Sequence, residues 1–269
     1  MPIILISRGS YSRGKEVADK VAERLGYESV AREVLLQASQ EFDVDVLKLM
    51  HAVRDSPSFF NRISYGKERY VAYIRAALLD HLKRDNVVYH GLAGHFFVRD
   101  VGHALKVRIT ADIEDRIRLV MERDGISEKA AGRFIKQIDK ERRDWSRSLY
   151  GIDNTDPNLY DLVLHIQKLT VDDAVDVICH TAGLEHLQAT DESRRTLEDD
   201  ALASAVKAVL VKEHPDAEVT AQDDVVYVCA KTTDATELRT ENEIRKLAQD
   251  VPGVKNVEVR LRSYIPFGI

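Results

Sequence analysis

Short apolar runs alternate with stretches of helical periodicity over the first two thirds of the chain. Five apolar runs predict strands, at about residues 2–7, 27–31, 86–89, 105–109 and 160–166. Between them, apolar residues recur every three or four positions and predict helices at about residues 14–25, 33–83, after 112, and 127–148, with a break near Pro57 in the second. Strands that alternate with helices are typical of an α/β fold, a parallel sheet with helices on both faces.

The pattern changes near Gln188. Residues 190–195 are polar and charged, which is typical of a linker. After them the predicted order is helix, strand, strand, helix and strand, at about residues 197–212, 217–221, 225–229, 235–250 and 254–261. This order predicts a separate small α+β domain. We therefore expect an α/β domain over residues 1–189 and an α+β domain over residues 190–269.

Composition narrows the class of protein. The chain has 269 residues, 44% of them hydrophobic, which is enough for one large or two smaller cores. A formal net charge of −6 argues against a nucleic-acid partner, so any anion site must come from local clusters of Arg and Lys. The opening apolar run is too short for a secretory signal, and no apolar stretch is long enough to span a bilayer. With only Cys179 and Cys229, we expect a cytoplasmic protein without a disulfide.

A glycine loop follows the first predicted strand. From Gly9 the residues match G-x-x-x-x-G-K, and a predicted helix follows at once, which is the context that a phosphate-binding loop requires. Backbone N–H groups of such a loop converge on an anion, and the helix dipole adds to their field. The residues that we expect to hold a nucleotide cofactor there are Ser12, Arg13, Gly14, Lys15 and Glu16. An ordinary turn that enters a helix is the alternative.

Glu16 departs from the motif. That position normally offers a Ser or Thr hydroxyl to Mg²⁺. A carboxylate beside phosphates is repelled unless a metal ion lies between them or the side chain turns away, so Glu16 is a candidate outer-sphere partner of Mg²⁺. The spacing of His90, His95 and His103 matches no helical metal pair, so we predict no metal site there and expect packed or surface histidines.

The helix predicted over residues 127–148 is rich in arginine. Asp139 shares a helix face with Arg142 and Arg143 and can pair with them. Phosphoryl transfer depends on positioning and on neutralising charge, so we predict that these two arginines close over phosphates while Asp139 orients them. The catalytic candidates are then Lys15, Asp139, Arg142 and Arg143. A solvated helix face with ordinary salt bridges is the alternative. We expect Arg116 and Arg118 on a helix surface, with contact to a nucleotide base as their alternative.

Several segments together resemble the cytidylate-kinase-like branch of P-loop nucleoside monophosphate kinases, over about residues 1–182. They are Ile6-Ser7-Arg8, Gly14-Lys15-Glu16, Leu25-Gly26-Tyr27, Arg32-Glu33, Val107-Arg108-Ile109 with Ala111 and Arg116, Asp139 with Arg142, and Tyr160-Asp161-Leu162-Val163. The resemblance implies a phosphate loop, a helical insert that binds the acceptor, and an arginine-rich lid. It also implies ATP and Mg²⁺ as cofactors and a nucleoside monophosphate or similar small phosphate acceptor as substrate. A Glu commonly follows the basic residue of the loop in that branch.

The chain also departs from the family pattern. Ala31 stands where an Asp is usual, Leu92 where an Arg follows Gly, and His165 where an Asn is expected. A second hypothesis is therefore a nucleotide-binding sensor with weak or no turnover. Residues 196–262 resemble a BON domain, which implies contact with a membrane surface or a protein partner through this part of the chain.

Aromatic and basic residues gather where the family carries the acceptor insert. The aromatic residues are Phe59, Phe60, Tyr65, Tyr70 and Tyr73. They fit either stacking on a base or packing against the core or a second subunit, so an oligomer stays open.

Overall fold

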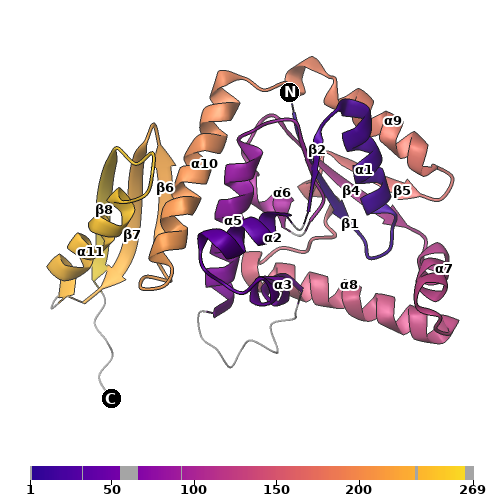
Figure 1. The fold of residues 1–269 in the computed structure, drawn as a ribbon, viewed down its shortest axis with the longest axis horizontal. Helices are drawn as coiled ribbons and strands as arrows, with labels where there is room; N and C mark the ends of the chain where they lie inside the picture. Colours follow the sequence, from indigo (N-terminus) through magenta and orange to yellow (C-terminus); the bar gives the residue numbers. More distant parts are fainter. Residues whose placement is uncertain (1, 32, 55–65, 92, 234–235, 264–269) are drawn as a thin grey trace.

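The computed structural model describes residues 2–31, 33–54, 66–91, 93–233 and 236–263. Its centre is a five-stranded parallel sheet with the strand order β2-β3-β1-β4-β5 (Figure 1). The strands are β1 Ile3–Arg8, β2 Glu28–Val30, β3 Val87–Tyr89, β4 Ala104–Ala111 and β5 Leu162–Ile166. The predicted α/β class and all five strands are confirmed.

Strand β1 shows why the sheet has helices on both faces. Alternate residues of a strand point to opposite faces. Ile3 and Leu5 join the core beneath one group of helices, whereas Ile4 and Ile6 join the core on the other face. All four side chains are buried, so the apolar run needs cover on both sides.

Helices α1 Gly14–Leu25 and α9 Val171–Ala182 cover one face of the sheet (Figure 1). Helix α1 confirms the prediction for residues 14–25 and ends at Gly26, which has φ +68° and serves as the C-cap. Helix α9 was not predicted from the sequence. Its buried residues recur at helical spacing, and a capping box of Thr170 and Asp173 begins it, so both signals were present.

The other face carries helices from the region predicted as helical over residues 33–83. These are α2 Glu33–Glu41, α3 Val46–Arg54 and α5 Gly66–Leu82, followed after β3 by the short α6 Gly94–Phe97. Tyr70 and Tyr73 are buried, and the Tyr73 ring stacks on Phe42 at 4.4 Å, so these two aromatic residues pack in the core. The break near Pro57 and the residues Phe59, Phe60 and Tyr65 lie outside the described residues.

Two helices connect β4 to β5 and lie at the carboxyl ends of the strands (Figure 1). They are α7 Ile113–Asp124 and α8 Glu128–Tyr150, and they share a small core of Val120, Ala131 and Ile135. Helix α8 confirms the arginine-rich helix predicted over residues 127–148. It ends at Gly151, whose φ of +66° suits a glycine.

The C-terminal part has its own mixed sheet, of order β6-β7-β8, with β6 antiparallel and β8 parallel to β7. Its elements are α10 Asp191–Leu210, β6 Glu218–Gln222, β7 Val225–Thr232, α11 Glu237–Gln249 and β8 Asn256–Ser263. The predicted small α+β fold is confirmed.

The predicted linker at residues 190–195 is wrong. Thr190 and Ser193 form a capping box, and α10 begins at Asp191. Acidic residues in the first turn of a helix interact favourably with the helix dipole. The polar composition of residues 190–195 is therefore that of a helix start. Leu197 and Ala201 of this helix belong to the core of the large domain, whereas Val206 belongs to the core beside β7. Helix α10 thus contributes side chains to both cores. We propose a domain boundary between residues 189 and 190, with α10 as the element that connects the two domains.

Candidate functional site

A cavity of about 200 Å³ lies at the carboxyl ends of β1 and β4, beneath α8. Open α/β sheets bind ligands at this edge. We call it the arginine cavity, and its lining residues are Arg8, Gly9, Arg108, Thr110, Ala111, Arg116, Asp139, Arg142, Arg143, Asn154 and Thr155. The structure therefore brings together three of the four catalytic candidates, Asp139, Arg142 and Arg143.

The charge of the cavity is strongly positive, because five arginines and one carboxylate line it. Arg142 is the most affected: burial, and then the guanidinium of Arg8, lower the pKa of Arg142 to about 10. Its Nη1 donates to the carbonyl oxygen of Arg8 at 2.9 Å. A bound anion would relieve the repulsion between these cations, so the lining fits a phosphate group.

Asp139 ties the lid helix α8 to the glycine loop. Its Oδ1 accepts a hydrogen bond from Ser10 Oγ at 2.6 Å, and its Oδ2 accepts one from Arg116 Nη2 at 2.6 Å. Arg116 also donates through Nε to the Ser10 carbonyl oxygen at 2.6 Å. The ion pair of Asp139 is thus with Arg116 and not with Arg142 or Arg143 as the helix spacing indicated.

The surface position expected for Arg116 is wrong, because its side chain is only 12% exposed and lies in the site. Arg118 is 68% exposed and pairs with Asp115, as expected for a surface residue. The two arginines lie two positions apart on α7, so they point to different faces of the helix. Composition alone does not tell these faces apart.

The glycine loop has the backbone shape of an anion nest. Tyr11 and Arg13 both have positive φ angles, of 58° and 60°, which cost a non-glycine residue about 1–2 kcal/mol each. Such conformations turn successive N–H groups toward one side. Within the described part of the chain, the amides of residues 10–16 donate to no protein acceptor. They remain available to an anion.

Ser12 and Gly14 shape the loop. Ser12 is buried, and its Oγ lies 3.0 Å from the carbonyl oxygens of both Gly9 and Ile109, so its side chain closes the loop. A Cβ on Gly14 would lie 2.6 Å from Cβ of Arg8. Glycine is therefore required where α1 begins, because Arg8 passes directly over it.

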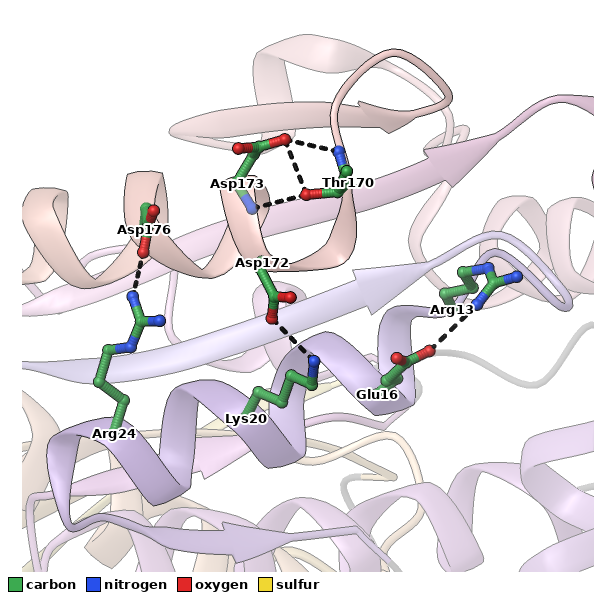
Figure 2. A network of polar contacts seen from close by, with 8 residues as sticks. All are labelled: Arg13, Glu16, Lys20, Arg24, Thr170, Asp172, Asp173 and Asp176. Carbon is green, nitrogen blue, oxygen red and sulfur yellow. Dashed lines mark hydrogen bonds and ion pairs between the residues drawn. The ribbon is translucent and has the colours of Figure 1, made fainter.

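Lys15 does not line the arginine cavity. Its side chain is 66% exposed, and its Nζ lies 3.9 Å from Asp19 Oδ2. Arg13 and Glu16 are also outside the cavity and pair with each other at 3.5 Å (Figure 2). Exposed pairs of this kind contribute little, so the Lys15 and Arg13 side chains reorient at small cost.

Glu16 shares its face of α1 with Lys20 and Arg24, and these two side chains connect α1 to α9. Lys20 pairs with Asp172 at 2.7 Å, and Arg24 pairs with Asp176 (Figure 2). These contacts orient α1 and with it the loop that precedes it.

A buried network of polar contacts surrounds Arg108, which lines the arginine cavity. The Tyr160 hydroxyl lies 2.8 Å from the Asn154 carbonyl oxygen and 3.3 Å from His95 Nε2. Arg108 Nη1 donates to the same carbonyl at 2.7 Å and to the Tyr160 hydroxyl at 3.3 Å. Burial, and then the charge of Arg108, lower the pKa of His95 to about 3, so the imidazole is neutral. The network fixes Arg108 and turns it toward the cavity.

Sequence reasoning missed Arg8, Ser10, Arg108 and Asn154 as site residues. Arg8 directly follows a buried apolar run and Ser7 at the end of β1, and Arg108 stands between the buried Val107 and Ile109 in β4, so a charged residue beside buried apolar positions was a usable signal. A charge in a buried strand is costly unless it has a partner or a ligand.

The structure describes two of the three positions that depart from the family pattern, His165 and Ala31. His165 lies 3.0 Å from Thr110 Oγ1 through Nδ1 and 3.0 Å from Asp112 Oδ1 through Nε2. The Ala31 amide donates to Glu33 Oε2 at 2.7 Å. Leu92 and Arg32 lie outside the described residues. His90, His95 and His103 are buried, so the packed alternative holds for all three.

Within the described residues, no three His, Cys, Asp or Glu side chains gather as metal ligands. None of the described helices has the length and apolar content that crossing a membrane requires.

The model of the cytidylate kinase-like family matches residues 3–168. A cytidylate kinase from Methanopyrus kandleri is 25% identical over 175 residues, which is 60% of this chain and 83% of the relative. Another, from Ignicoccus hospitalis, is 29% identical over 181 residues, 66% and 97% of the two chains. A solved structure of an uncharacterized protein from Eubacterium ventriosum has a TM-score of 0.51 at 22% identity and covers 68% of this chain and 98% of its own. This last likeness shows the fold alone.

The matched residues include the glycine loop, both strands that carry cavity arginines, and the whole of α8. The match spans more than half of the chain, so the chain belongs to the cytidylate kinase-like family.

Proposed function

We propose that this protein is an ATP-dependent phosphotransferase that acts on a nucleoside monophosphate or a similar small acceptor. The observation that carries the proposal is the arginine cavity beside a loop with unpaired amides. Transfer of a phosphoryl group spreads negative charge over its oxygens, and fixed cations stabilise that charge. The two relatives from Methanopyrus kandleri and Ignicoccus hospitalis, both cytidylate kinases, support the same class of reaction.

The size of the cavity supports separate binding places for the phosphoryl groups and for the nucleoside parts of the substrates. At about 200 Å³ it is smaller than the roughly 300–1,000 Å³ of a pocket that encloses a whole small ligand. It therefore takes phosphoryl groups, and the nucleoside parts lie outside it. The amides of residues 10–16 bind donor phosphates, and Lys15 reaches them after leaving Asp19.

The charged residues of the cavity have two kinds of task in this proposal. Arg142 and Arg143 come from the lid and neutralise the transferring group, while Arg8 and Arg108 do so from the sheet. Asp139 holds the lid against the loop through Ser10. Glu16, beside the loop, would orient the water shell of a Mg²⁺ ion, which would supply positive charge to the phosphates.

A sensor with weak or no turnover is the second candidate. The position of Lys15 favours it, because the side chain pairs with Asp19 and stays outside the cavity. In this version the C-terminal domain, which we propose to be BON-like, reports nucleotide occupancy to a protein partner or a membrane surface. Helix α10 would carry that report, because it packs against α5 and against the small sheet.

The test uses the purified full chain with ATP, Mg²⁺ and a panel of nucleoside monophosphates, and measures nucleoside diphosphate by chromatography. We expect turnover with at least one monophosphate, and a loss of about 100-fold or more in kcat for Arg142→Ala. Lys136→Ala, an exposed change on the same helix, is the matched control. ATP binding without transfer would favour the sensor, and neither binding nor transfer would refute both candidates.

A further inference from the structure

A hydroxyl, an imidazole and a carboxylate form a hydrogen-bonded chain at the arginine cavity. Thr110 of β4 lines that cavity, and it lies directly opposite His165 of β5 in the sheet. Its Oγ1 lies 3.0 Å from Nδ1 of His165, and Nε2 of His165 lies 3.0 Å from Oδ1 of Asp112. Enzymes that activate a hydroxyl as a nucleophile arrange the nucleophile, the base and the group that orients the base in this order.

The carboxylate determines where the protons of this chain lie. An ionised Asp112 can only accept a hydrogen bond, so Nε2 of His165 carries the ring proton. Nδ1 of a neutral imidazole is then an acceptor, and the Thr110 hydroxyl donates to it. The carbonyl oxygen of Leu164 is the more distant acceptor for this hydroxyl, at 3.3 Å. The Thr110 proton therefore faces a base that can take it up.

The surroundings of Thr110 fit a phosphoryl group. Side chains two residues apart on a strand lie on the same face, so the Arg108 side chain is the neighbour of Thr110 along β4. Arg8 and Arg142 line the same cavity, and their fixed charges stabilise the negative charge of a transferring phosphoryl group. A phosphoryl group in this cavity thus has the Thr110 hydroxyl in the wall around it.

We propose that Thr110 accepts the γ-phosphoryl group of a nucleoside triphosphate, so that the protein phosphorylates itself in the arginine cavity. Oγ1 of Thr110 bonds to the γ-phosphorus, and its proton passes to Nδ1 of His165. The bond between the γ-phosphorus and the bridging oxygen breaks, and the nucleoside diphosphate leaves with that electron pair. His165 is 48% exposed, so it returns the extra proton to water. This inference rests on the proposed function for its phosphoryl donor.

Thr155 gives an internal comparison for the role of the base. It lines the same cavity, and its hydroxyl donates to Oδ1 of Asp153 at 2.7 Å. That hydrogen bond holds the pKa of Asp153 below its usual range, so this carboxylate is a weaker base than an imidazole. Proximity alone would phosphorylate either hydroxyl, whereas the imidazole selects Thr110.

The experiment incubates the purified full chain with ATP and Mg²⁺ and without an added phosphate acceptor. Intact-mass spectrometry measures the phosphate gained by the chain, and peptide mapping identifies the residue that carries it. We expect one phosphate per chain, on Thr110 and not on Thr155, with one ADP released for each. A parallel incubation uses acetyl phosphate, a phosphoryl donor without a nucleoside, which needs the arginine cavity but not a nucleotide site.

The variants separate the nucleophile from its base. Thr110→Val removes the hydroxyl and should abolish the labelling. His165→Gly removes the base and should slow the labelling by about 100-fold or more, and added imidazole should restore part of the rate. Thr181→Val, on α9 and outside the cavity, is the matched control and should be labelled at the rate of the unchanged chain.

Asp112 is a positioning residue in this proposal. Asp112→Asn should slow the labelling because an amide can also donate to Nε2 and so place the ring proton on Nδ1. Asp112→Glu should recover part of the lost rate, since it restores a carboxylate. Asp112 makes no capping hydrogen bond to α7, so both changes leave the contacts at the helix start in place.

The outcomes separate this inference from the proposed function. Phosphate on Thr155 instead of Thr110, or equal labelling of His165→Gly and Thr181→Val, would overturn the inference. Transfer to an added nucleoside monophosphate without labelling of Thr110 would also overturn it and leave the proposed function standing. If ATP neither binds nor reacts, the proposed function fails and acetyl phosphate decides: labelling of Thr110 supports the inference, and no labelling overturns it.

Discussion

Replacing Asp139 with Asn should destabilise the ligand-free protein and, at the same time, strengthen its binding of phosphate. Asp139 is the only carboxylate among five arginines in the arginine cavity. It accepts two hydrogen bonds of 2.6 Å, from Ser10 and from Arg116. The change Asp139→Asn keeps the shape and one oxygen acceptor but removes the negative charge, so it isolates the electrostatic part of the contact.

The magnitude follows from the two bonds. A hydrogen bond to a charged group contributes about 1.5–3 kcal/mol, and the amide of Asn offers an oxygen to only one of the two donors, so the variant loses about one such bond. Asp139 and Arg116 are 24% and 12% exposed, so solvent screens the pair only in part. The free energy of unfolding should therefore fall by about 2 kcal/mol. For a chain of this size that corresponds to a loss of about 4–8 °C in Tm.

Phosphate should reverse much of this loss. A bound anion supplies the negative charge that the variant lacks, so the variant binds phosphate more tightly and gains more stability at a given concentration. The assay is thermal unfolding in buffer at constant ionic strength, with and without inorganic phosphate. Asp144→Asn, on the same helix and without an ion pair among the described residues, is the control. Equal melting temperatures for the two variants, or equal gains with phosphate, would show that Asp139 does not balance the arginines.

Three further predictions test other parts of the structure. Gly14→Ala places a Cβ 2.6 Å from Cβ of Arg8, so urea unfolding should show a loss of about 1–3 kcal/mol, together with weaker phosphate binding; an unchanged variant contradicts the close approach. A chain that ends at residue 189 loses the apolar residues of α10 from the large core, chiefly Leu197, and should unfold at lower urea than a chain that ends at residue 215, which keeps Leu197; equal urea midpoints contradict the place of α10 in that core. The pKa of His95 is lowered to about 3 by burial and then by Arg108, so the unfolded state binds a proton that the folded state does not between pH 6.5 and 3. Stability should then fall with falling pH by about 1.4 kcal/mol per unit more in the native chain than in His95→Asn, and parallel pH profiles in urea unfolding contradict it.

Much of the fold was predictable because its signals are local. The buried strand β1 and the helix α1 show their own periodicity, and the cap at Gly26 marks where the helix ends. The start of α10 was mistaken for a linker because capping residues and acidic first-turn residues have the same composition as a loop. Local patterns separate these two cases only when the capping box of Thr190 and Ser193 is recognised.

The site was less predictable because its residues meet through sheet order. Strands β1 and β4 are neighbours although about a hundred residues separate them, and their register places Ser7 beside Arg108 and Arg8 beside Ile109. This brings the two arginines to one edge of the sheet, and no local spacing contains that information. Lys15 shows the opposite case: its motif position was clear, but a helical neighbour at i+4, Asp19, decides where its side chain lies in the ligand-free protein.

The contacts of Asp85 explain why α10 is packed against the large domain and does not act as a flexible linker. Asp85 lies in the turn before β3, and its carboxylate pairs with Arg194 of α10 at 3.0 Å and with the buried His103 at 3.3 Å. His103 in turn accepts the Ile3 amide through its carbonyl oxygen at 2.9 Å, at the start of the strand that ends in Arg8. The first turn of α10 is therefore fixed to the strand that carries a cavity arginine. A shift of α10 must break these contacts and those of Leu197 in the large core, or move the strand with it, so α10 is packed against the body that carries the phosphate site.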